Sequence, residues 1–254
     1  MLINSLNNPK IKFVRNYLKS NAYRKKAKVF VLETLKPILD ICQNKPELIE
    51  YILCNENTRV EFPDSINKNK ILKINSKIFD KLTTLKAHQG IVAVAKNEEI
   101  VFSDVINKAK NIVLLEGIQN PSNFGAVVRS AIAFNIDAVF YTGNYVNPHH
   151  PESIRAMAGN VFQIPLVKLE QKEVIELTKM EYQLYSFVPD TGVDLKKIKF
   201  GKKNVFVFGA EGQGISNKFL LDKSKKVNIK MNSEIESLNI AVSAGIVFHY
   251  FNMS

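Results

Sequence analysis

The residues with the clearest chemical potential lie where apolar runs give way to polar loops. Asn123 and Arg129 follow an apolar run at residues 112–115, and the sequence directly after that run, EGIQNPSNFG (residues 116–125), is rich in turn and capping residues. A helix is expected to begin near Ser122 or Asn123. Open α/β sheets place their sites at the carboxyl ends of parallel strands, so this loop is expected to form part of a site. Arginine stays protonated, so Arg129 suits stabilisation of negative charge or a phosphate clamp.

A second polar loop, within residues 205–216, combines three glycines with a carboxylate in the sequence VFVFGAEGQGIS. A glycine-rich turn between a strand and a helix often cradles a phosphate. Here, however, Glu211 stands where a dinucleotide fold needs its second glycine, and a carboxylate there would repel a pyrophosphate. The absence of Gly-Lys-Ser/Thr also argues against a P-loop. The loop is therefore either a simple glycine turn or a site for a neutral or cationic ligand beside Glu211.

A third polar loop precedes the last apolar stretch of the chain, in the sequence VNIKMNSEIESLNIAVSAG over residues 227–245. Ser237 is a natural N-cap for a helix over residues 238–251. Asn239 would then lie in the first turn, with its side chain free to reach a neighbouring loop. Capping alone would explain both residues equally well, so this loop by itself decides nothing.

The pattern of apolar runs predicts two α/β units, and the second of them carries these loops. The first hundred residues predict a compact α/β/α unit, which a polar break at residues 96–99 ends. The remainder alternates strands and helices, which favours a parallel sheet covered on both faces. Helices are expected over residues 4–20, 35–42, 76–83, 152–158 and 172–180, and strands over 29–32, 49–54, 71–74, 91–95, 138–141, 183–188, 204–208 and 227–231.

Composition indicates a globular protein with an unevenly placed positive charge. The 254 residues are 46% hydrophobic and carry a net charge of +11. Residues 1–100 hold 18 basic and 10 acidic side chains, and the first thirty hold eight basic ones and no acidic one. This asymmetry favours contact between the N-terminal part and a polyanion such as a nucleic acid. A lysine-rich surface that serves solubility alone is the alternative.

The sequence also indicates a cytoplasmic setting. No run is apolar and long enough to span a bilayer, and residues 1–30 lack the apolar segment of a secretory signal. Cys42 and Cys54 are too few for a disulfide framework, and they are expected to be buried thiols. His149 and His150 lack partners at metal-ligand spacing, so no metal is expected.

Taken together, NPSNFGAVVR, GAEGQG and IKM…SLN, in this order, resemble the three motifs of the SpoU (TrmH) family. Members of this family are S-adenosylmethionine-dependent RNA ribose 2′-O-methyltransferases. The segments NNPKIKFVRNYL, VFVLET and QGIVAV resemble the substrate-binding domain that these enzymes often carry, which is related to ribosomal protein L30e. The resemblance covers essentially the whole chain.

The resemblance implies an α/β fold with two domains and a homodimer. An L30e-like RNA substrate-binding domain is expected over residues 1–96, followed by a linker and lead-in over residues 97–109. A SPOUT methyltransferase domain with a deep trefoil knot is expected over residues 110–254, with the methyl donor bound at the knot. Knots are otherwise nearly absent from proteins, so this is a strong structural commitment.

The resemblance also implies residue roles by position. The catalytic residues would be Arg129, Asn123, Glu211, Ser237 and Asn239. The residues that bind S-adenosylmethionine would be Gly209, Gly214, Ile229, Met231 and Leu238. The expected RNA contacts in the basic N-terminal part are Lys10, Lys12, Arg15, Arg24, Lys25 and Lys26.

The sequence therefore predicts an RNA 2′-O-ribose methyltransferase, and the separate N-terminal domain favours ribosomal RNA as its substrate by analogy. A transfer RNA substrate is one alternative. A catalytically silent RNA-binding or ribosome-assembly protein of the same fold is another, although the intact polar residues Arg129, Glu211 and Asn239 argue against it. The sequence leaves open which group accepts the proton and whether Arg129 acts within its own subunit.

Overall fold

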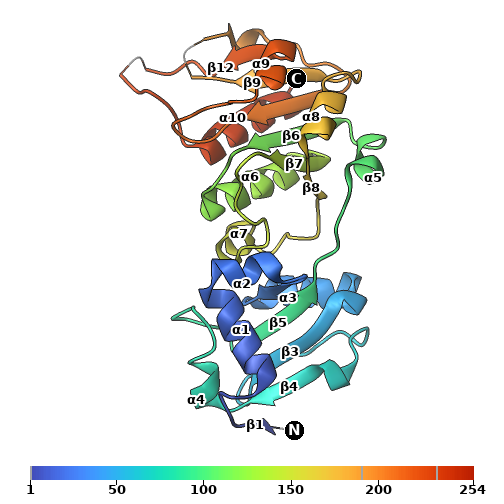
Figure 1. Cartoon of the computed structure of the whole chain (residues 1–254), viewed down its shortest axis with the longest axis vertical. Helices are drawn as coiled ribbons and strands as arrows, with labels where there is room; N and C mark the ends of the chain where they lie inside the picture. The colour runs from blue at the N-terminus through green and yellow to red at the C-terminus, as the bar shows by residue number, and fades with distance from the viewer. Residues whose placement is uncertain (1, 190, 233) are drawn as a thin grey trace. The chain divides into compact units, whose positions relative to one another are not determined.

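The computed structural model describes residues 2–189, 191–232 and 234–254. Two compact units divide the chain (Figure 1). The first comprises the chain up to Glu98 together with His149–Val161, and the second comprises Glu99–Pro148 and Phe162–Ser254. Residues 149–161 thus pack with the first unit, although the sequence placed everything from residue 110 onward in the second domain. No helix in the described part of the chain is long and apolar enough to cross a bilayer.

The first unit is built on a five-stranded sheet in the order β1-β4-β3-β5-β2. β5 runs antiparallel to β2 and β3, and the other pairs are parallel. The strands are β1 (Leu2–Ile3), β2 (Val29–Leu32), β3 (Ile49–Asn55), β4 (Ile71–Ile74) and β5 (Ile91–Lys96). The helices are α1 (Pro9–Lys19), α2 (Asn21–Lys26), α3 (Leu35–Asn44), α4 (Ser76–Phe79) and α7 (Pro151–Ala156), with 3₁₀ turns at Pro46–Leu48 and Lys68–Lys70.

A buried carboxylate joins α7 to the rest of the first unit. The Glu33 side chain is only 2% exposed, and its Oε2 lies 3.1 Å from Nη1 of Arg155 on α7. Glu33 Oε1 also accepts hydrogen bonds from Thr83 Oγ1 at 2.7 Å and from the Thr84 amide at 3.1 Å. α4 ends at Phe79, four residues before the expected end at residue 83.

The second unit is built on a seven-stranded parallel sheet, as the sequence predicted, in the order β10-β12-β9-β11-β6-β7-β8. Its central strands, β6 and β11, are almost entirely buried, which explains their uninterrupted apolar runs. The strands are β6 (Asn111–Glu116), β7 (Ala138–Thr142), β8 (Leu166–Lys168), β9 (Gln183–Phe187), β10 (Val193–Asp194), β11 (Asn204–Phe208) and β12 (Lys225–Asn228). The helices are α5 (Phe102–Ile106), α6 (Pro121–Ala133), α8 (Gln171–Leu177), α9 (Lys218–Lys223) and α10 (Ile240–Asn252), with a 3₁₀ turn at Leu195–Lys197.

Aromatic side chains fix α10 on the second sheet. The ring of Phe206 on β11 lies 5.8 Å from that of Phe248 and 5.1 Å from that of Phe251, both on α10. Phe208 contacts Phe248 from the same strand at 6.1 Å. Edge-on contacts of this kind add directional preference to apolar burial. α10 also packs against α6 (Figure 1), so the positions of both helix starts are set by the core.

We expect replacement of Arg155 by alanine to destabilise the first unit by about 1–3 kcal/mol, because Glu33 would lose one of its donors while remaining buried. Urea unfolding of the full chain, followed by circular dichroism, measures this effect. Lys179→Ala, which removes an exposed cation from the second unit, is the control. Equal unfolding midpoints for the Arg155 variant and the wild type would show that the ion pair contributes nothing.

Candidate active site

Polar side chains from three distant segments of the second unit meet beyond the ends of β6 and β11. Asn123 Nδ2 donates a hydrogen bond to Glu211 Oε1, and Asn239 Nδ2 donates one to Asn123 Oδ1 at 3.0 Å. Asn239 Nδ2 also lies 3.5 Å from Glu211 Oε1. Three residues that lie in separate loops of the sequence therefore form one hydrogen-bonded group, which we call the Asn123–Glu211–Asn239 cluster.

Asn123 is positioned by the start of α6. The helix begins at Pro121, and its N-cap is Asn120, whose side chain accepts a hydrogen bond from the Asn123 amide at 3.1 Å. The helix therefore begins one residue before Ser122, close to the expected start. Proline is well suited to the first helical position, where its missing N–H costs no helical hydrogen bond.

Asn239 is positioned by its own capping bond. Its Oδ1 accepts from the Ala241 amide at 2.9 Å, which makes Asn239 the N-cap of α10. Since the oxygen is used in this way, the amide nitrogen is the part of the side chain that remains for the cluster. Ser237, expected to be the cap, is exposed and lies two residues before it, so that expectation is wrong. The part that Ser237 plays in the site stays a prediction.

Glu211 stands on a closed glycine loop. Ala210 and Gly214 exchange two backbone hydrogen bonds, at 3.0 and 2.8 Å. A Cβ on Gly209 would lie 2.1 Å from the carbonyl carbon of Gly214, so no larger residue fits at that position. Gly212 and Gly214 have φ values of +81° and +66°, which L-residues with side chains rarely adopt. The loop backbone therefore presents Glu211 at an exposed position.

A buried carboxylate that sequence reasoning missed ties this loop to the central strand. Glu116, the last residue of β6, is 6% exposed. Its two oxygens accept hydrogen bonds from the amide of Ser216 at 3.0 Å and from the Ser216 hydroxyl at 2.7 Å. An acidic residue that ends an otherwise apolar strand was the available signal, because a buried charge needs donors.

Arg129 is exposed on α6 and is not bonded to the cluster. It makes no hydrogen bond or ion pair with any residue that the structure describes. Glu211 and Asn239 therefore do not orient Arg129 directly here. The guanidinium is free to contact a substrate, and arginine remains charged throughout the physiological pH range.

The residues expected to bind a cofactor fit a ligand that is partly apolar and not anionic. A Cβ added to Gly212 or Gly214 would have no atom within 4 Å, so a ligand can approach the loop backbone at these positions. Ile229, Met231 and Leu238 are half-buried and offer apolar surface. The carboxylate of the adjacent Glu211 favours a cation over a phosphate. Gly209 has a structural role in the loop, and its contact with a cofactor stays a prediction.

His149 and His150 lie in the first unit, where each contacts other side chains of that unit. His149 stacks on Phe30 with ring centroids 4.7 Å apart, and burial lowers its pKa to about 4. His150 Nε2 lies 3.1 Å from Nη2 of Arg24, and burial followed by the Arg24 charge lowers the pKa of His150. Both rings are therefore neutral at physiological pH.

The chain matches two family models. The model described as the SpoU rRNA Methylase family matches residues 110–249, which is more than half of the chain. The chain belongs to the SpoU rRNA methylase family. A second model, described as RNA 2′-O ribose methyltransferase substrate binding, matches residues 31–101.

Similar proteins include other methyltransferases. The 23S rRNA (guanosine(2553)-2′-O)-methyltransferase RlmP of Bacillus subtilis is 24% identical over 250 residues, or 98% of each chain. A 23S rRNA (adenosine(1067)-2′-O)-methyltransferase of Streptomyces azureus is 29% identical over 151 residues, which cover 58% of this chain and 56% of that protein. An uncharacterised tRNA/rRNA methyltransferase of Synechocystis sp. is 26% identical over 178 residues. That match covers 69% of this chain and 65% of the relative, so this chain spans less than two thirds of it.

Solved structures of two methyltransferases share the fold. An rRNA methyltransferase from Sinorhizobium meliloti with bound S-adenosylmethionine has a TM-score of 0.88 at 23% identity, covering 98% of this chain and 96% of that one. The SpoU methyltransferase AviRb from Streptomyces viridochromogenes, also with this cofactor, has a TM-score of 0.81 at 20% identity, covering 97% of each chain. The predicted family, α/β fold and RNA 2′-O-methyltransferase class are confirmed.

We expect Glu116→Ala to lower kcat/KM for RNA methylation by about 10- to 100-fold, since small displacements of positioned groups are costly. Ser216→Ala should lower it less, because the Ser216 amide would still donate to Glu116. Methyl transfer assays with radiolabelled donor measure both values, and RNA affinity serves as the control that should not change. Unchanged kcat/KM in Glu116→Ala would show that the loop needs no anchor at β6.

Proposed function

We propose that this SpoU family member transfers a methyl group from S-adenosylmethionine to a ribose 2′-hydroxyl of ribosomal RNA. The observation that carries the proposal is the Asn123–Glu211–Asn239 cluster, which joins residues of three separate motifs. Arg129 extends from the same helix as Asn123 and is free to meet a substrate. A silent RNA-binding protein would have no need for this convergence of polar groups.

The methyl donor would contact the glycine loop and three apolar residues of the third motif. Gly214 offers open backbone, and Ile229, Met231 and Leu238 offer apolar surface for an adenine ring. When bound, S-adenosylmethionine supplies a sulfonium methyl group as the electrophile. The charge of Glu211 favours such a cationic ligand. Support comes from the two structural neighbours described above, each of which holds this cofactor.

Arg129 would act on the RNA side of the reaction. A ribose 2′-hydroxyl is a weak acid, so the site must stabilise the negative charge that develops on its oxygen. Arg129 can do this directly or by holding the neighbouring phosphate, but as a permanently charged group it is not an ordinary base. Asn123 and Asn239 hold the Glu211 carboxylate in one orientation, and the cluster would thereby position the nucleotide.

RNA would be held mainly by the first unit. Lys10, Lys12, Lys25 and Lys26 are exposed on α1 and α2, and Arg15 is half-buried. Arg24 is different: it is 7% exposed, and its Nη1 donates to the carbonyls of Tyr17 and Leu18. A guanidinium used in this way cannot contact RNA, so we leave Arg24 out of the proposed surface.

Ribosomal RNA is the favoured substrate because the B. subtilis relative that aligns over 98% of each chain is named for it. Transfer RNA is the alternative. Mass-spectrometric mapping of 2′-O-methyl marks in ribosomal and transfer RNA, from cells with and without the protein, decides between them. A mark that depends on the protein in transfer RNA alone would overturn the preference.

We further propose that the chain forms a homodimer through the exposed face of α10. Val242 and Ile246 lie one turn apart on this helix and are 51% and 38% exposed, although both are large apolar residues. Apolar side chains exposed in this way often mark an association surface. The deep knot expected of the second unit also remains part of this proposal.

Arg129→Ala should reduce kcat for methyl transfer by about 100- to 1,000-fold, the usual effect of losing one electrostatic stabiliser. The affinity for S-adenosylmethionine, measured by calorimetry, should stay within about twofold, because Arg129 does not belong to the donor-binding loops. Transfer at the wild-type rate would exclude the role of Arg129. Failure of the wild type to bind the donor would instead favour the silent RNA-binding alternative.

The double substitution Val242→Glu and Ile246→Glu should convert the dimer to a monomer, because burying two carboxylates in an apolar interface is costly. Sedimentation velocity measures the change, with Lys179→Glu as the control for added negative charge at an exposed position of the second unit. A wild-type chain that sediments as a monomer at micromolar concentration would contradict the proposed dimer.

A further inference from the structure

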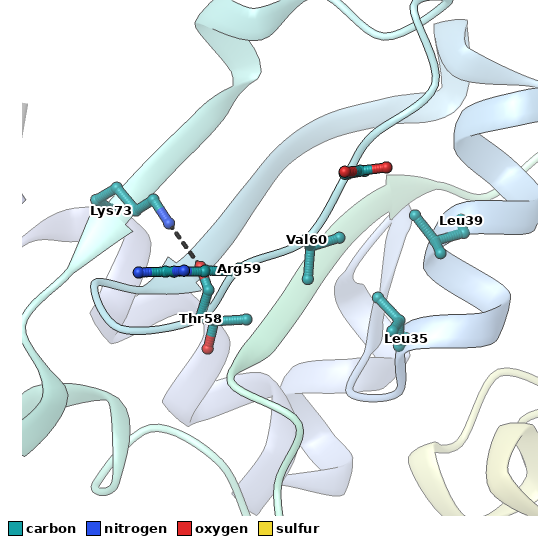
Figure 2. A pocket seen from close by; sticks show the side chains of 7 residues that line it. Leu35, Leu39, Thr58, Arg59, Val60 and Lys73 are labelled. Carbon is teal, nitrogen blue, oxygen red and sulfur yellow. Dashed lines mark hydrogen bonds between the residues drawn. The ribbon is translucent and has the colours of Figure 1, made fainter.

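A hollow of about 650 Å³ opens on the first unit, between the start of α3, the loop after β3, and β4 (Figure 2). Small-molecule sites have volumes of roughly 300–1,000 Å³, so the space suits a single nucleotide and not a duplex. None of its residues belongs to the expected RNA-contacting set. The lining residues are Leu35, Leu39, Thr58, Arg59, Val60, Glu61 and Lys73.

The lining combines an apolar wall with two cations. Figure 2 shows Leu35 and Leu39 of α3 on one side of Val60, with Arg59 and Lys73 on its other side. A nucleobase presents flat, weakly polar faces, and its sugar is joined to a phosphate. Proteins that read unpaired RNA place bases against apolar or guanidinium surfaces and use cations for the phosphates. The two halves of the lining match these two requirements.

The loop that carries Arg59 is held in place by contacts of its neighbour Thr58. Lys73 Nζ donates to the Thr58 carbonyl at 2.9 Å, and the Thr58 amide donates to the Asn55 carbonyl at 3.0 Å. Gly90 packs so closely that a Cβ there would lie 1.9 Å from Thr58 Oγ1. The loop is thus formed before any ligand binds, which reduces the entropy lost on binding.

Arg59 itself remains available. It is exposed and makes no hydrogen bond or ion pair within the described residues 2–189, 191–232 and 234–254. An arginine held next to an anchored residue but without a protein partner is well placed for an anionic ligand. The whole lining also falls within residues 31–101, which match the substrate-binding family model.

We propose that this hollow holds one unstacked nucleotide of the RNA substrate. Arg59 contacts its phosphate or the face of its base, and Leu39 and Val60 pack against the base. The carboxylate of Glu61 accepts hydrogen bonds from amino groups on the base edge. The inference rests on the proposed RNA methyltransferase function, but it concerns residues separate from the Asn123–Glu211–Asn239 cluster.

Fluorescence anisotropy of the full chain with a labelled, mixed-sequence, single-stranded 12-nucleotide RNA tests the proposal. Arg59→Ala should weaken binding about 5- to 50-fold, and if Arg59 holds a phosphate, it should reduce the slope of log affinity against log salt by about 0.7. Val60→Asn should weaken binding about 5-fold without changing the slope, since it removes base contact only. Lys81→Ala, an exposed cation of the same unit outside the lining, should stay within about twofold.

The same RNA annealed to its complement should bind with little dependence on Arg59 or Val60, because a duplex cannot enter the hollow. Wild-type affinity for single-stranded RNA in both variants, with their melting temperatures unchanged, would overturn the proposal while leaving methyl transfer intact. Conversely, weakened RNA binding by Arg59→Ala in a chain that methylates no RNA would sustain the nucleotide site and refute the proposed function.

Discussion

The capping of α10 by Asn239 is the constraint on which the site depends. One side chain ends the polar loop, caps the helix through Oδ1, and completes the cluster through Nδ2. Its place is set from the other end of the helix, where Phe248 and Phe251 pack on Phe206. A shift of one residue in this packing would rotate the helix by about 100° and remove the amide from the cluster. The apolar core of the second unit therefore determines the geometry of its most polar region.

Much of the fold could be predicted because the central strands are buried on both faces. β11 was expected over residues 204–208 and lies there, and the second sheet is parallel throughout. The helix caps were harder to predict, because Ser237 and Asn239 are both good caps and only the packing of α10 selects between them. Glu116 was missed because its partner, Ser216, is a hundred residues away. Local patterns carry no information about contacts at that distance.

The distribution of charge along the sequence predicted that the first unit is basic. It did not predict which of the basic side chains are available to RNA. Four of the six expected RNA contacts are exposed, but Arg24 is buried and bonded to backbone carbonyls. Its neighbours Lys25 and Lys26, on the same short helix, remain exposed. The three residues point in different directions around the helix, so Arg24 is buried and the two lysines are not. A count of basic residues cannot distinguish them. Arg59, isolated in the sequence from any basic run, gained significance only from the hollow that it lines.

The placement of residues 149–161 has a consequence for the construction of chimeras from this chain. The chain passes between its two units three times, after residues 98, 148 and 161. An exchange of substrate-binding modules at the first crossing alone would separate Glu33 from Arg155 and leave a foreign α7 against the new module. Each unit is therefore encoded by two separate segments of the sequence and cannot be exchanged as one continuous piece. A functional chimera must inherit the short α7 segment from the same parent as the first hundred residues.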